Sequence, residues 1–491
     1  MPKFTAKLEI KSLISTLIPL DMSAPGMADL WEHLNTFLSY EVQNSIFIKA
    51  TSNSKYIRDI WDGRTHLFNT KTGKFLTGLL PYVQEALTQF EIVYEVIDYR
   101  PEYSAETKSY PLSNMLDVRK YQSEAVDACV AKKRGIIHAK PRSGKTIIEI
   151  MLVARLNIFP VLSICQSIDI AKQTIDKFKQ FLPDIPVGLI GDGTCDIQPI
   201  TVATIQSLSM AYKIKDKFPK GKIEKDPPAL KRDNIRNLVE RAKFVWVDES
   251  HHAAGATYKH ILQHKIYAAE YILGCSGTPY REDNTDLLID GLLGPIIYEI
   301  NYSKLIEGGY LVRPTIHLIQ LPKLLNIPDN LPYASLYKQA VSSNAFRNDT
   351  IAKIARALIK KDKTCMILVN KIGHGKTLKK LIPSAEFSYS KTENRGILWK
   401  RLKERILPCL ITTLGDEGID IASLDAIIIA AGGKSAIKVF QRLRCMTPYP
   451  GKKNAIVVDF MDPYKYLSVH SKKREKLYKS EPSFIINYKK A

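Results

Sequence analysis

The sequence predicts an α/β protein in which two parallel-sheet domains follow a small α+β N-terminal domain. Three observations support this fold class. Short apolar strands alternate with helical stretches from about residue 116 onward, which is typical of parallel α/β sheets. A phosphate-loop pattern that contains Lys145 and Thr146 stands between an apolar strand and a helix. The length of 491 residues fits three domains of about 150 residues, each large enough to bury a core.

The first 110 residues read as the small α+β domain. Apolar residues at helical spacing predict helices over 28–38 and 79–90, and short apolar runs predict strands over 46–48 and 92–96. The segment 101–115 is polar and contains two prolines, so it is predicted to be a linker.

The rest of the chain divides into two sheet domains and a tail. We expect the first sheet domain over residues 111–320, the second over 321–465, and a basic C-terminal tail over 466–491. The stretch 316–326, which is followed by two prolines, is expected to separate the two sheets.

Basic residues exceed acidic residues, and the excess is uneven. The chain has 71 Lys and Arg against 50 Asp and Glu, a net charge of +21, while residues 1–110 hold 11 basic and 13 acidic residues. The excess falls on residues 211–243, 352–405 and 464–491. A basic balance of this kind indicates a polyanionic partner, nucleic acid before membrane, although a basic soluble enzyme is the plainer alternative.

Other classes are disfavoured. No apolar run approaches the roughly 18 residues that a membrane span needs, and no apolar signal segment follows the first residues. The seven cysteines are far apart and form no C-x-x-C pair, which argues against a disulfide framework or a zinc site. We expect a cytoplasmic protein, in the host cell if a phage encodes it, without a membrane partner.

The phosphate loop is the strongest local signal. An apolar strand ends at Ala139, and a helix is predicted from Ile147 onward. Backbone N–H groups at such a helix start attract anions, Lys145 can reach the β- and γ-phosphates, and the Thr146 hydroxyl can bind Mg²⁺. The predicted nucleotide-binding loop comprises Lys140, Pro141, Arg142, Ser143, Gly144, Lys145 and Thr146.

A second acidic site is predicted at another strand end. The apolar run 244–247 leads into Asp248-Glu249-Ser250-His251. Asp248 is expected to hold Mg²⁺ and Glu249 to orient and deprotonate the attacking water. An isolated Asp-Glu pair would more often be a solvated carboxylate pair, but this one follows Lys145 in the order that an ATPase of this class requires.

Taken together, these motifs resemble those of superfamily 2 helicases and translocases over roughly residues 111–465. The resemblance implies two RecA-like domains that bind ATP and Mg²⁺. It implies an adenine-side motif with Arg119 and Gln122, a DNA-backbone motif with Thr204 and Gln206, and a coupling motif with Ser276 and Thr278, to which His251 contributes. In the second domain it implies that Gly418 and Asp420 bind the nucleotide and that Lys371 contacts DNA. It also implies a final motif that contains Gln441 and Arg444.

The last of these motifs is shortened. Superfamily 2 helicases usually carry Q-x-x-G-R-x-x-R, whereas Gln441-Arg442-Leu443-Arg444 lacks the glycine and Thr447 occupies the second arginine position. Gln441 and Arg444 are expected to be catalytic, with Arg444 as the arginine finger and Arg442 as the alternative. If neither arginine serves, hydrolysis is expected to be slow, because the loss of such a residue costs about 10³ in rate or more.

The front domain narrows the resemblance. The run Trp61-Asp62-Gly63-Arg64 is similar to the N-terminal domain of UvsW-type phage recombination helicases, and His374-Gly375-Lys376 also resembles that family. The resemblance implies ATP-driven remodelling of branched or duplex DNA, with Trp61, Arg64, Lys371 and Lys376 among the DNA contacts. Without it, Asp62-Gly63 is a turn between two strands and Trp61 a core residue. Recombination or replication proteins are possible partners, and a monomer is expected.

Two alternatives differ in class. The chain could be an RNA helicase or a restriction-type duplex DNA translocase, which the front domain disfavours. It could also be a DNA-binding scaffold with a decayed ATPase, which the shortened final motif suggests and the intact Lys145, Thr146, Asp248 and Glu249 disfavour.

Overall fold

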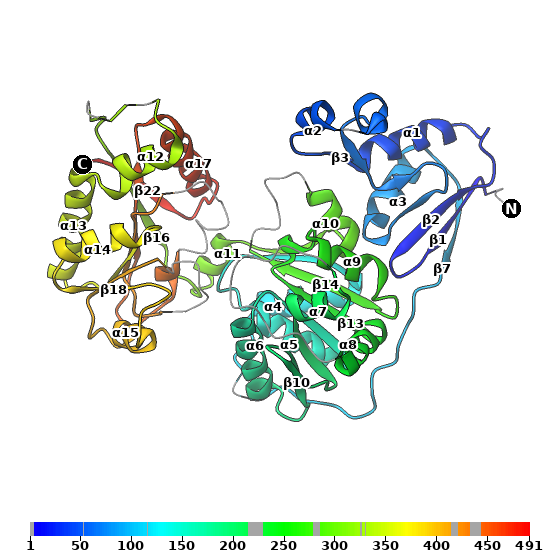
Figure 1. Ribbon diagram of the computed structural model, residues 1–491. Coiled ribbons are helices and arrows are strands. Elements are labelled where there is room, and N and C mark those ends of the chain that lie inside the picture. Colours follow the sequence, from blue (N-terminus) through cyan, green and yellow to red (C-terminus); the bar gives the residue numbers. More distant parts are fainter. Residues whose placement is uncertain are drawn as a thin grey trace. The chain divides into compact units, whose positions relative to one another are not determined.

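The chain folds into two compact units (Figure 1). Unit 1 comprises residues 1–139 and 144–300, and unit 2 comprises residues 140–143 and 301–491. Within the described ranges, no helix has the length and apolar composition needed to cross a bilayer. The computed structural model describes residues 4–52, 54–114, 116–214, 229–277, 285–324, 327–328, 330–413, 421–432 and 443–491.

The front part of unit 1 is a mixed five-stranded sheet in the order β5-β6-β2-β1-β7. Its β1 and β7 strands are parallel, and its other neighbours are antiparallel. Helices α1 and α3 lie where the sequence predicts them. The bounds are β1 Ala6–Ile10, β2 Ile14–Pro19, β5 Phe68–Asn69, β6 Lys74–Leu76, β7 Tyr94–Asp98, α1 Met27–Phe37 and α3 Leu80–Gln89.

One expected strand is a helix. Residues 46–48 were predicted to be a strand, but they belong to α2 (Ser45–Thr51), which leads to a π-helical turn over Tyr56–Ile60. The apolar run favours a strand only where a partner strand and a core are available, and here Ile46 and Phe47 are exposed by 83% and 68%. The small β3–β4 pair (Ser39–Glu41 and Arg64–His66) flanks this helical segment.

The second sheet of unit 1 has the order β11-β10-β12-β9-β13-β14-β8-β15 and is parallel except at β10–β11. Strands β9, β12 and β14 are buried along their whole length, as expected for a sheet covered on both faces. The strand bounds are β8 Arg134–Ala139, β9 Val161–Cys165, β10 Val187–Gly191, β11 Thr194–Cys195, β12 Ile200–Thr204, β13 Phe244–Asp248, β14 Tyr271–Ser276 and β15 Ile296–Ile300.

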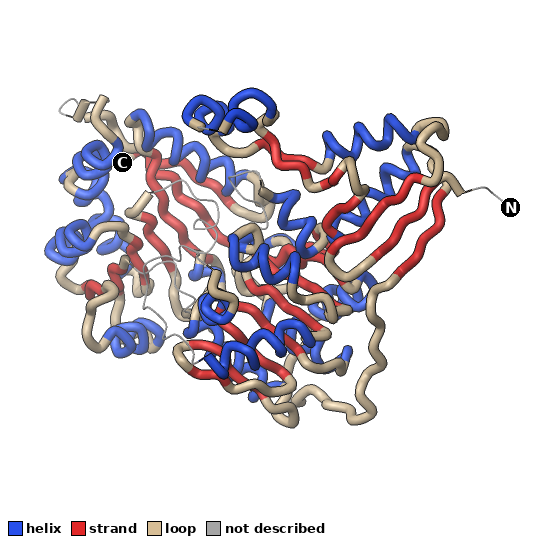
Figure 2. Tube along the Cα trace, turned by 45° about the vertical axis from the view of Figure 1, so that its right-hand side comes forward, coloured by secondary structure: helices blue, strands red, loops and turns tan. Residues whose placement is uncertain are grey.

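Helices cover this sheet, and the alternation that the sequence predicts is confirmed (Figure 2). The helix bounds are α4 Lys120–Lys132, α5 Lys145–Leu156, α6 Ile168–Phe181, α7 Ile205–Ala211, α8 Ala229–Arg241, α9 Ala256–His264 and α10 Asp286–Leu293.

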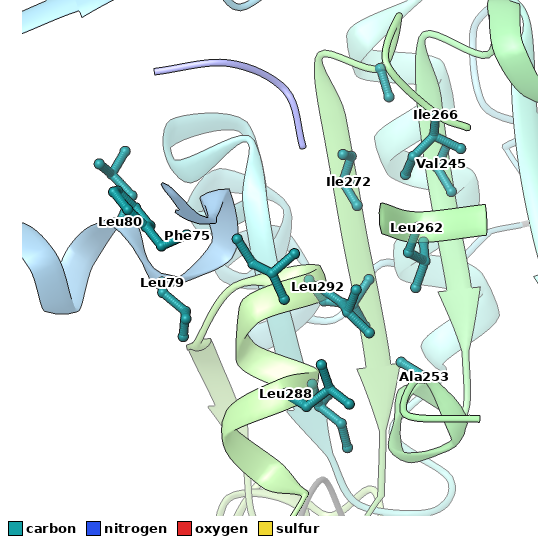
Figure 3. Close-up of a cluster of buried hydrophobic side chains, with 14 of the residues drawn as sticks. Phe75, Leu79, Leu80, Val245, Ala253, Leu262, Ile266, Ile272, Leu288 and Leu292 are labelled. Atoms are coloured by element: carbon teal, nitrogen blue, oxygen red, sulfur yellow. The ribbon is translucent and has the colours of Figure 1, made fainter. Parts of the chain in front are cut away.

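The front part and the second sheet of unit 1 share one hydrophobic core. Figure 3 shows Leu79 of the front part beside Leu288 and Leu292 of α10. A methyl group on Gly78 would lie 2.0 Å from the carbonyl oxygen of Asp290, so the two backbones are in close contact. The Tyr82 hydroxyl donates to Asp290 Oδ2 at 2.7 Å. The front part is therefore built onto the sheet domain rather than tethered to it.

Unit 2 is a seven-stranded sheet in the order β18-β19-β17-β20-β21-β16-β22, with parallel pairing throughout its described strands. The bounds are β16 Pro314–Gln320, β17 Cys365–Leu368, β18 Ala385–Ser388, β19 Cys409–Thr412, β20 Ala426–Ile429, β21 Ala455–Met461, β22 Ile485–Lys490, α11 Tyr302–Glu307, α12 Tyr333–Tyr337, α13 Ala345–Lys360, α14 Ile372–Leu381, α15 Arg395–Lys403 and α17 Lys465–Lys479.

Two boundaries of unit 2 differ from the expected ones. Residues 314–320, expected to close the first domain, form β16 inside the second sheet, because Ile316 and Leu318 are buried there. Residues 466–491, expected to be a separate tail, form most of α17 and the strand β22, which pairs with β16. The charge of this segment concealed its buried positions: Arg474 is buried and bonded to both carboxylate oxygens of Asp459, at 2.8 and 3.0 Å.

Candidate functional site

The phosphate-loop residues connect β8 to α5. Gly144 adopts φ +80°, and a Cβ there would lie 2.4 Å from the Gln122 amide nitrogen, so the loop requires glycine at this position. Arg142 also adopts a positive φ of 73°. That conformation is costly for arginine and explains why glycine is common at the equivalent position of similar loops. Lys145 and Thr146 open α5, as the motif requires.

Lys145 and the acid pair lie together at the carboxyl edge of the sheet. The Lys145 Nζ atom is 2.6 Å from Glu249 Oε1. Glu249 follows β13 with φ 50°, a left-handed conformation that turns its side chain toward Lys145 at the strand end. His251 Nδ1 lies 3.3 Å from Glu249 Oε2 and 2.9 Å from Ser276 Oγ, which joins the acid to the end of β14.

Burial and charge set the protonation of these groups. Burial alone would lower the pKa of Lys145, but the Glu249 and Asp248 carboxylates outweigh it and raise that pKa above its usual value. Burial would likewise raise the pKa of Glu249, but Lys145 and His251 hold it below the usual range. Burial raises the pKa of Asp248. A charged lysine thus faces an ionised Glu249, the form that can accept a proton from water.

The residues fit a magnesium ion that is held partly by phosphate. Asp248 ends β13, and the Thr146 hydroxyl stands in the first turn of α5. Within the part of the chain that the structure describes, no cluster of three or more His, Cys, Asp or Glu side chains could hold a metal. Mg²⁺ typically binds one or two protein oxygens and completes its shell with phosphate and water, so a sparse site of this kind suits it.

Arg119 and Gln122 are oriented by the start of α4. The Arg119 N–H donates to Gln122 Oε1 at 3.0 Å, and the Gln122 N–H donates to the Arg119 carbonyl at 2.8 Å. This capping box buries Gln122 and directs its amide nitrogen toward Gly144. The predicted adenine-side motif therefore lies next to the phosphate loop.

The predicted DNA-backbone residues Thr204 and Gln206 also form hydrogen bonds within the fold. The Thr204 hydroxyl is buried and caps α7 by accepting from the Ser207 N–H at 3.3 Å. The Gln206 amide donates to the Gln166 carbonyl at 2.9 Å, and Gln166 in turn donates to the Tyr258 hydroxyl at 2.8 Å. Sequence reasoning missed Gln166 and Tyr258. The position of Gln166, directly after the buried strand β9, is the signal that could have found it.

Trp61 and Arg64 stabilise the β3–β4 pair through hydrogen bonds. The Trp61 indole donates to the Arg64 carbonyl at 2.7 Å, and Arg64 donates to the Ser39 hydroxyl at 2.8 Å and to the Ser39 carbonyl at 2.9 Å. Asp62 and Gly63 lie between the π-helical turn Tyr56–Ile60 and β4, and Trp61 is half-buried, so the alternative expectation of a turn between two strands with Trp61 in the core is wrong. A DNA contact by either residue remains a prediction.

In unit 2, Lys371 precedes α14 and Lys376 lies on it, both exposed. His374 between them is buried against Asn348 at 2.8 Å, and burial lowers its pKa to about 3, so it is a neutral packing residue. Arg444 begins a short 3₁₀ turn, and its side chain lies outside the described residues. Thr278, Gly418, Asp420 and Gln441 also lie outside the described residues.

Comparison with known proteins agrees with this geometry. The family model described as "Type III restriction enzyme, res subunit" matches residues 115–281, which contain the loop and the acid pair. A protein of Sulfolobus islandicus filamentous virus assigned as helicase 22 is 26% identical, with 92% of this chain and 84% of that protein covered. The ATP-dependent DNA helicase uvsW of Enterobacteria phage T4 is 23% identical, with 88% and 87% covered.

A solved structure supports the fold. The fragment of an HsdR subunit assigned to a type I restriction enzyme from Vibrio vulnificus is similar with a TM-score of 0.55 and 18% identity. The match covers 78% of this chain and 70% of that chain. At this identity the likeness concerns the fold alone, and it agrees with two successive parallel α/β sheets.

Proposed function

We propose that this chain, a superfamily 2 DNA helicase that hydrolyses ATP, uses the energy of hydrolysis to remodel branched DNA. The observation that carries the proposal is the Lys145–Glu249 pair at 2.6 Å, beside Asp248 and the start of α5. A cation for the phosphates, an acid for the water and a carboxylate for the metal stand at one sheet edge, which is what phosphoryl transfer to water requires.

The chain's residues divide the work of hydrolysis. The α5 N-terminus and Lys145 bind and orient the phosphates. Glu249 positions a water molecule and takes its proton as the water oxygen bonds to the γ-phosphorus; the bond to the β–γ bridging oxygen breaks and ADP leaves. Mg²⁺, held by Asp248 and Thr146, would neutralise the developing charge. His251 contacts Glu249 and also Ser276, with its Nδ1 atom 2.9 Å from Ser276 Oγ, so it links the position of Glu249 to the end of β14.

DNA binding is assigned to the basic surface of unit 2. Lys371, directly before α14, and Lys376 and Lys380 on α14 are exposed. Lys400, Arg401 and Lys403 lie on α15 within the most basic stretch of the chain. Such contacts reach phosphates and carry no sequence information. Replacing Lys376 and Lys380 by alanine is expected to weaken binding to all DNA sequences and to lower the salt slope by about one per lysine.

The branched substrate is supported by the match to uvsW, which covers 88% of this chain and 87% of that helicase. Because this front part carries no basic excess, we assign to it recognition of DNA shape rather than backbone grip.

One assay separates the candidate functions. ATP hydrolysis is measured without nucleic acid, with RNA, with linear duplex DNA and with a four-way DNA junction. The proposal expects the junction to stimulate most. RNA as the best activator would identify an RNA helicase, and linear duplex as the best would identify a duplex translocase. No stimulation by any nucleic acid would support a scaffold with a decayed ATPase.

A further inference from the structure

A row of polar side chains crosses the carboxyl edge of the second sheet in unit 1 in the order of its strands. Gln206 follows β12, Gln166 follows β9, and Glu249 follows β13, which are neighbours in the sheet. Thr204 pairs with Cys165, and Ile164 pairs with Val247, so these three side chains leave the sheet at nearly the same level. The edge therefore brings the predicted DNA-backbone segment to within one strand of the acid pair.

Hydrogen bonds connect the first part of this row. Gln206 Nε2 donates to the Gln166 carbonyl at 2.9 Å, and Gln166 Nε2 donates to the Tyr258 hydroxyl at 2.8 Å. Tyr258 lies on α9, which packs against α7, the helix that carries Gln206. Only 3% of Tyr258 is exposed, so its hydroxyl is held by protein rather than by bulk water.

Tyr258 is also connected to the catalytic end of the row along the chain. The 3₁₀ turn Ser250–His252 directly follows Glu249, and α9, which carries Tyr258, begins soon afterwards at Ala256. The Gln206 Oε1 atom is buried without a hydrogen-bond partner among the described residues, so the amide has one acceptor that a shift of α7 could satisfy. Movement of the Gln206 segment would thus displace Gln166 and Tyr258, and with them the turn that follows Glu249.

We propose that Tyr258 is a positioning residue that couples DNA binding at the Gln166 and Gln206 segments to the geometry of the Asp248–Glu249 pair. The inference rests on the proposed function and deepens it. Tyr258 touches neither the phosphates nor the attacking water. Its hydroxyl fixes Gln166, so that DNA bound at these strand ends and nucleotide bound at the acid pair favour the same arrangement of α7 and α9.

The direct test is Tyr258→Phe, which keeps the buried ring and removes the hydroxyl. ATP hydrolysis without nucleic acid should stay within about twofold of the unsubstituted protein, while stimulation by a four-way junction should fall about tenfold, a typical size for coupling between sites. Tyr212→Phe is the matched control, because the Tyr212 hydroxyl of the same unit is buried and has no hydrogen-bond partner among the described residues. This control should retain full stimulation.

Binding measurements separate coupling from a structural defect. Coupling free energies are reciprocal, so a non-hydrolysable ATP analogue should change junction affinity, and the junction should change analogue affinity, by one common factor. Tyr258→Phe should reduce both factors together while leaving junction affinity without the analogue unchanged. Gln166→Leu removes the other end of the same bond, and the double variant should be no worse than either single variant.

Four outcomes distinguish the coupling role of Tyr258 from its alternatives. Loss of stimulation at normal basal hydrolysis, with non-additive single variants, supports the inference. Full stimulation in Tyr258→Phe overturns it. An equal fall in basal and stimulated hydrolysis also overturns it, because Tyr258 would then only support the acid pair. Absence of stimulation in the unsubstituted protein would instead refute the proposed function, so the two failures are distinguishable.

Discussion

The ammonium nitrogen of Lys145 lies 2.6 Å from Glu249 Oε1, so the residue assigned to the phosphates and the residue assigned to the water form one ion pair. Each sets the charge of the other: Glu249 raises the pKa of Lys145, and Lys145 lowers that of Glu249. Replacing either residue therefore changes both functions of the site.

Lys145→Ala is expected to lower ATP hydrolysis by about 10³ or more, because the phosphates lose their cation and Glu249 loses the charge that keeps it ionised. Junction binding should change little, since the basic surface of unit 2 is untouched. Steady-state hydrolysis and a binding titration check both parts. Lys259→Ala, an exposed lysine on α9, is the control. Unchanged hydrolysis in Lys145→Ala would show that the site is misassigned.

Asp290 should make stability depend on pH. Burial raises its pKa to about 6, from an ordinary value of 3.8. A raised carboxyl pKa means that the folded state holds the proton more tightly than the unfolded state does. Ionising Asp290 therefore lowers the free energy of unfolding. This loss of stability is absent below about pH 4, grows between about pH 4 and 6, and is complete above about pH 6. Asp290→Asn should therefore stabilise the protein at pH 8, on the order of 2 kcal/mol, and less at pH 5.

Thermal melting at the two pH values tests this expectation. Asp127→Asn, an exposed carboxylate on α4, is the control and should show no difference between pH 5 and pH 8. An equal effect of Asp290→Asn at both pH values would contradict the assignment and indicate that the carboxylate is ionised throughout.

Gly78→Ala should loosen the front part from the rest of unit 1. The new methyl would lie 2.0 Å from the Asp290 carbonyl oxygen and 2.6 Å from that of Gly291, and backbone atoms there cannot yield without moving α10. We expect a cost of about 1–3 kcal/mol, a lower melting temperature and faster proteolysis between the two parts. Gly373→Ala on α14 meets nothing within 4 Å and should be tolerated. Equal behaviour of the two variants would contradict the tight contact.

Arg474→Leu tests whether α17 belongs to unit 2. The substitution leaves Asp459 buried without its bidentate partner, so a cost of about 3–5 kcal/mol is expected, measured as a loss of melting temperature. The double variant Arg474→Leu with Asp459→Leu should recover part of the loss, because neither charge then remains buried. Lys473→Ala, exposed on the same helix, should be neutral. A neutral Arg474→Leu would mean that the helix is only loosely attached.

The sequence predicts the parallel sheets and the grouping of Lys145 with Asp248 and Glu249, because motifs at strand ends must meet at one sheet edge. It does not predict the integration of residues 465–490, since a composition-based reading counts Arg474 as surface charge while the structure buries it beside Asp459. The sequence also does not predict the helix over Ser45–Thr51, because a short apolar run favours a buried strand, whereas Ile46 and Phe47 are exposed on this helix. The Gln166–Tyr258 contact carries no motif and could only be found in three dimensions.

The core that the front part shares with α10 also bears on how such a chain can change over evolution. A domain joined by a linker can be exchanged or lost without harm to its neighbour. Here the exchange would strip apolar cover from Leu288 and Leu292 and leave Arg134 without the Ser12 carbonyl that accepts its hydrogen bond. The front part and the second sheet of unit 1 should therefore be inherited together, and recombination between relatives should leave viable products only when the crossover falls outside residues 4–300.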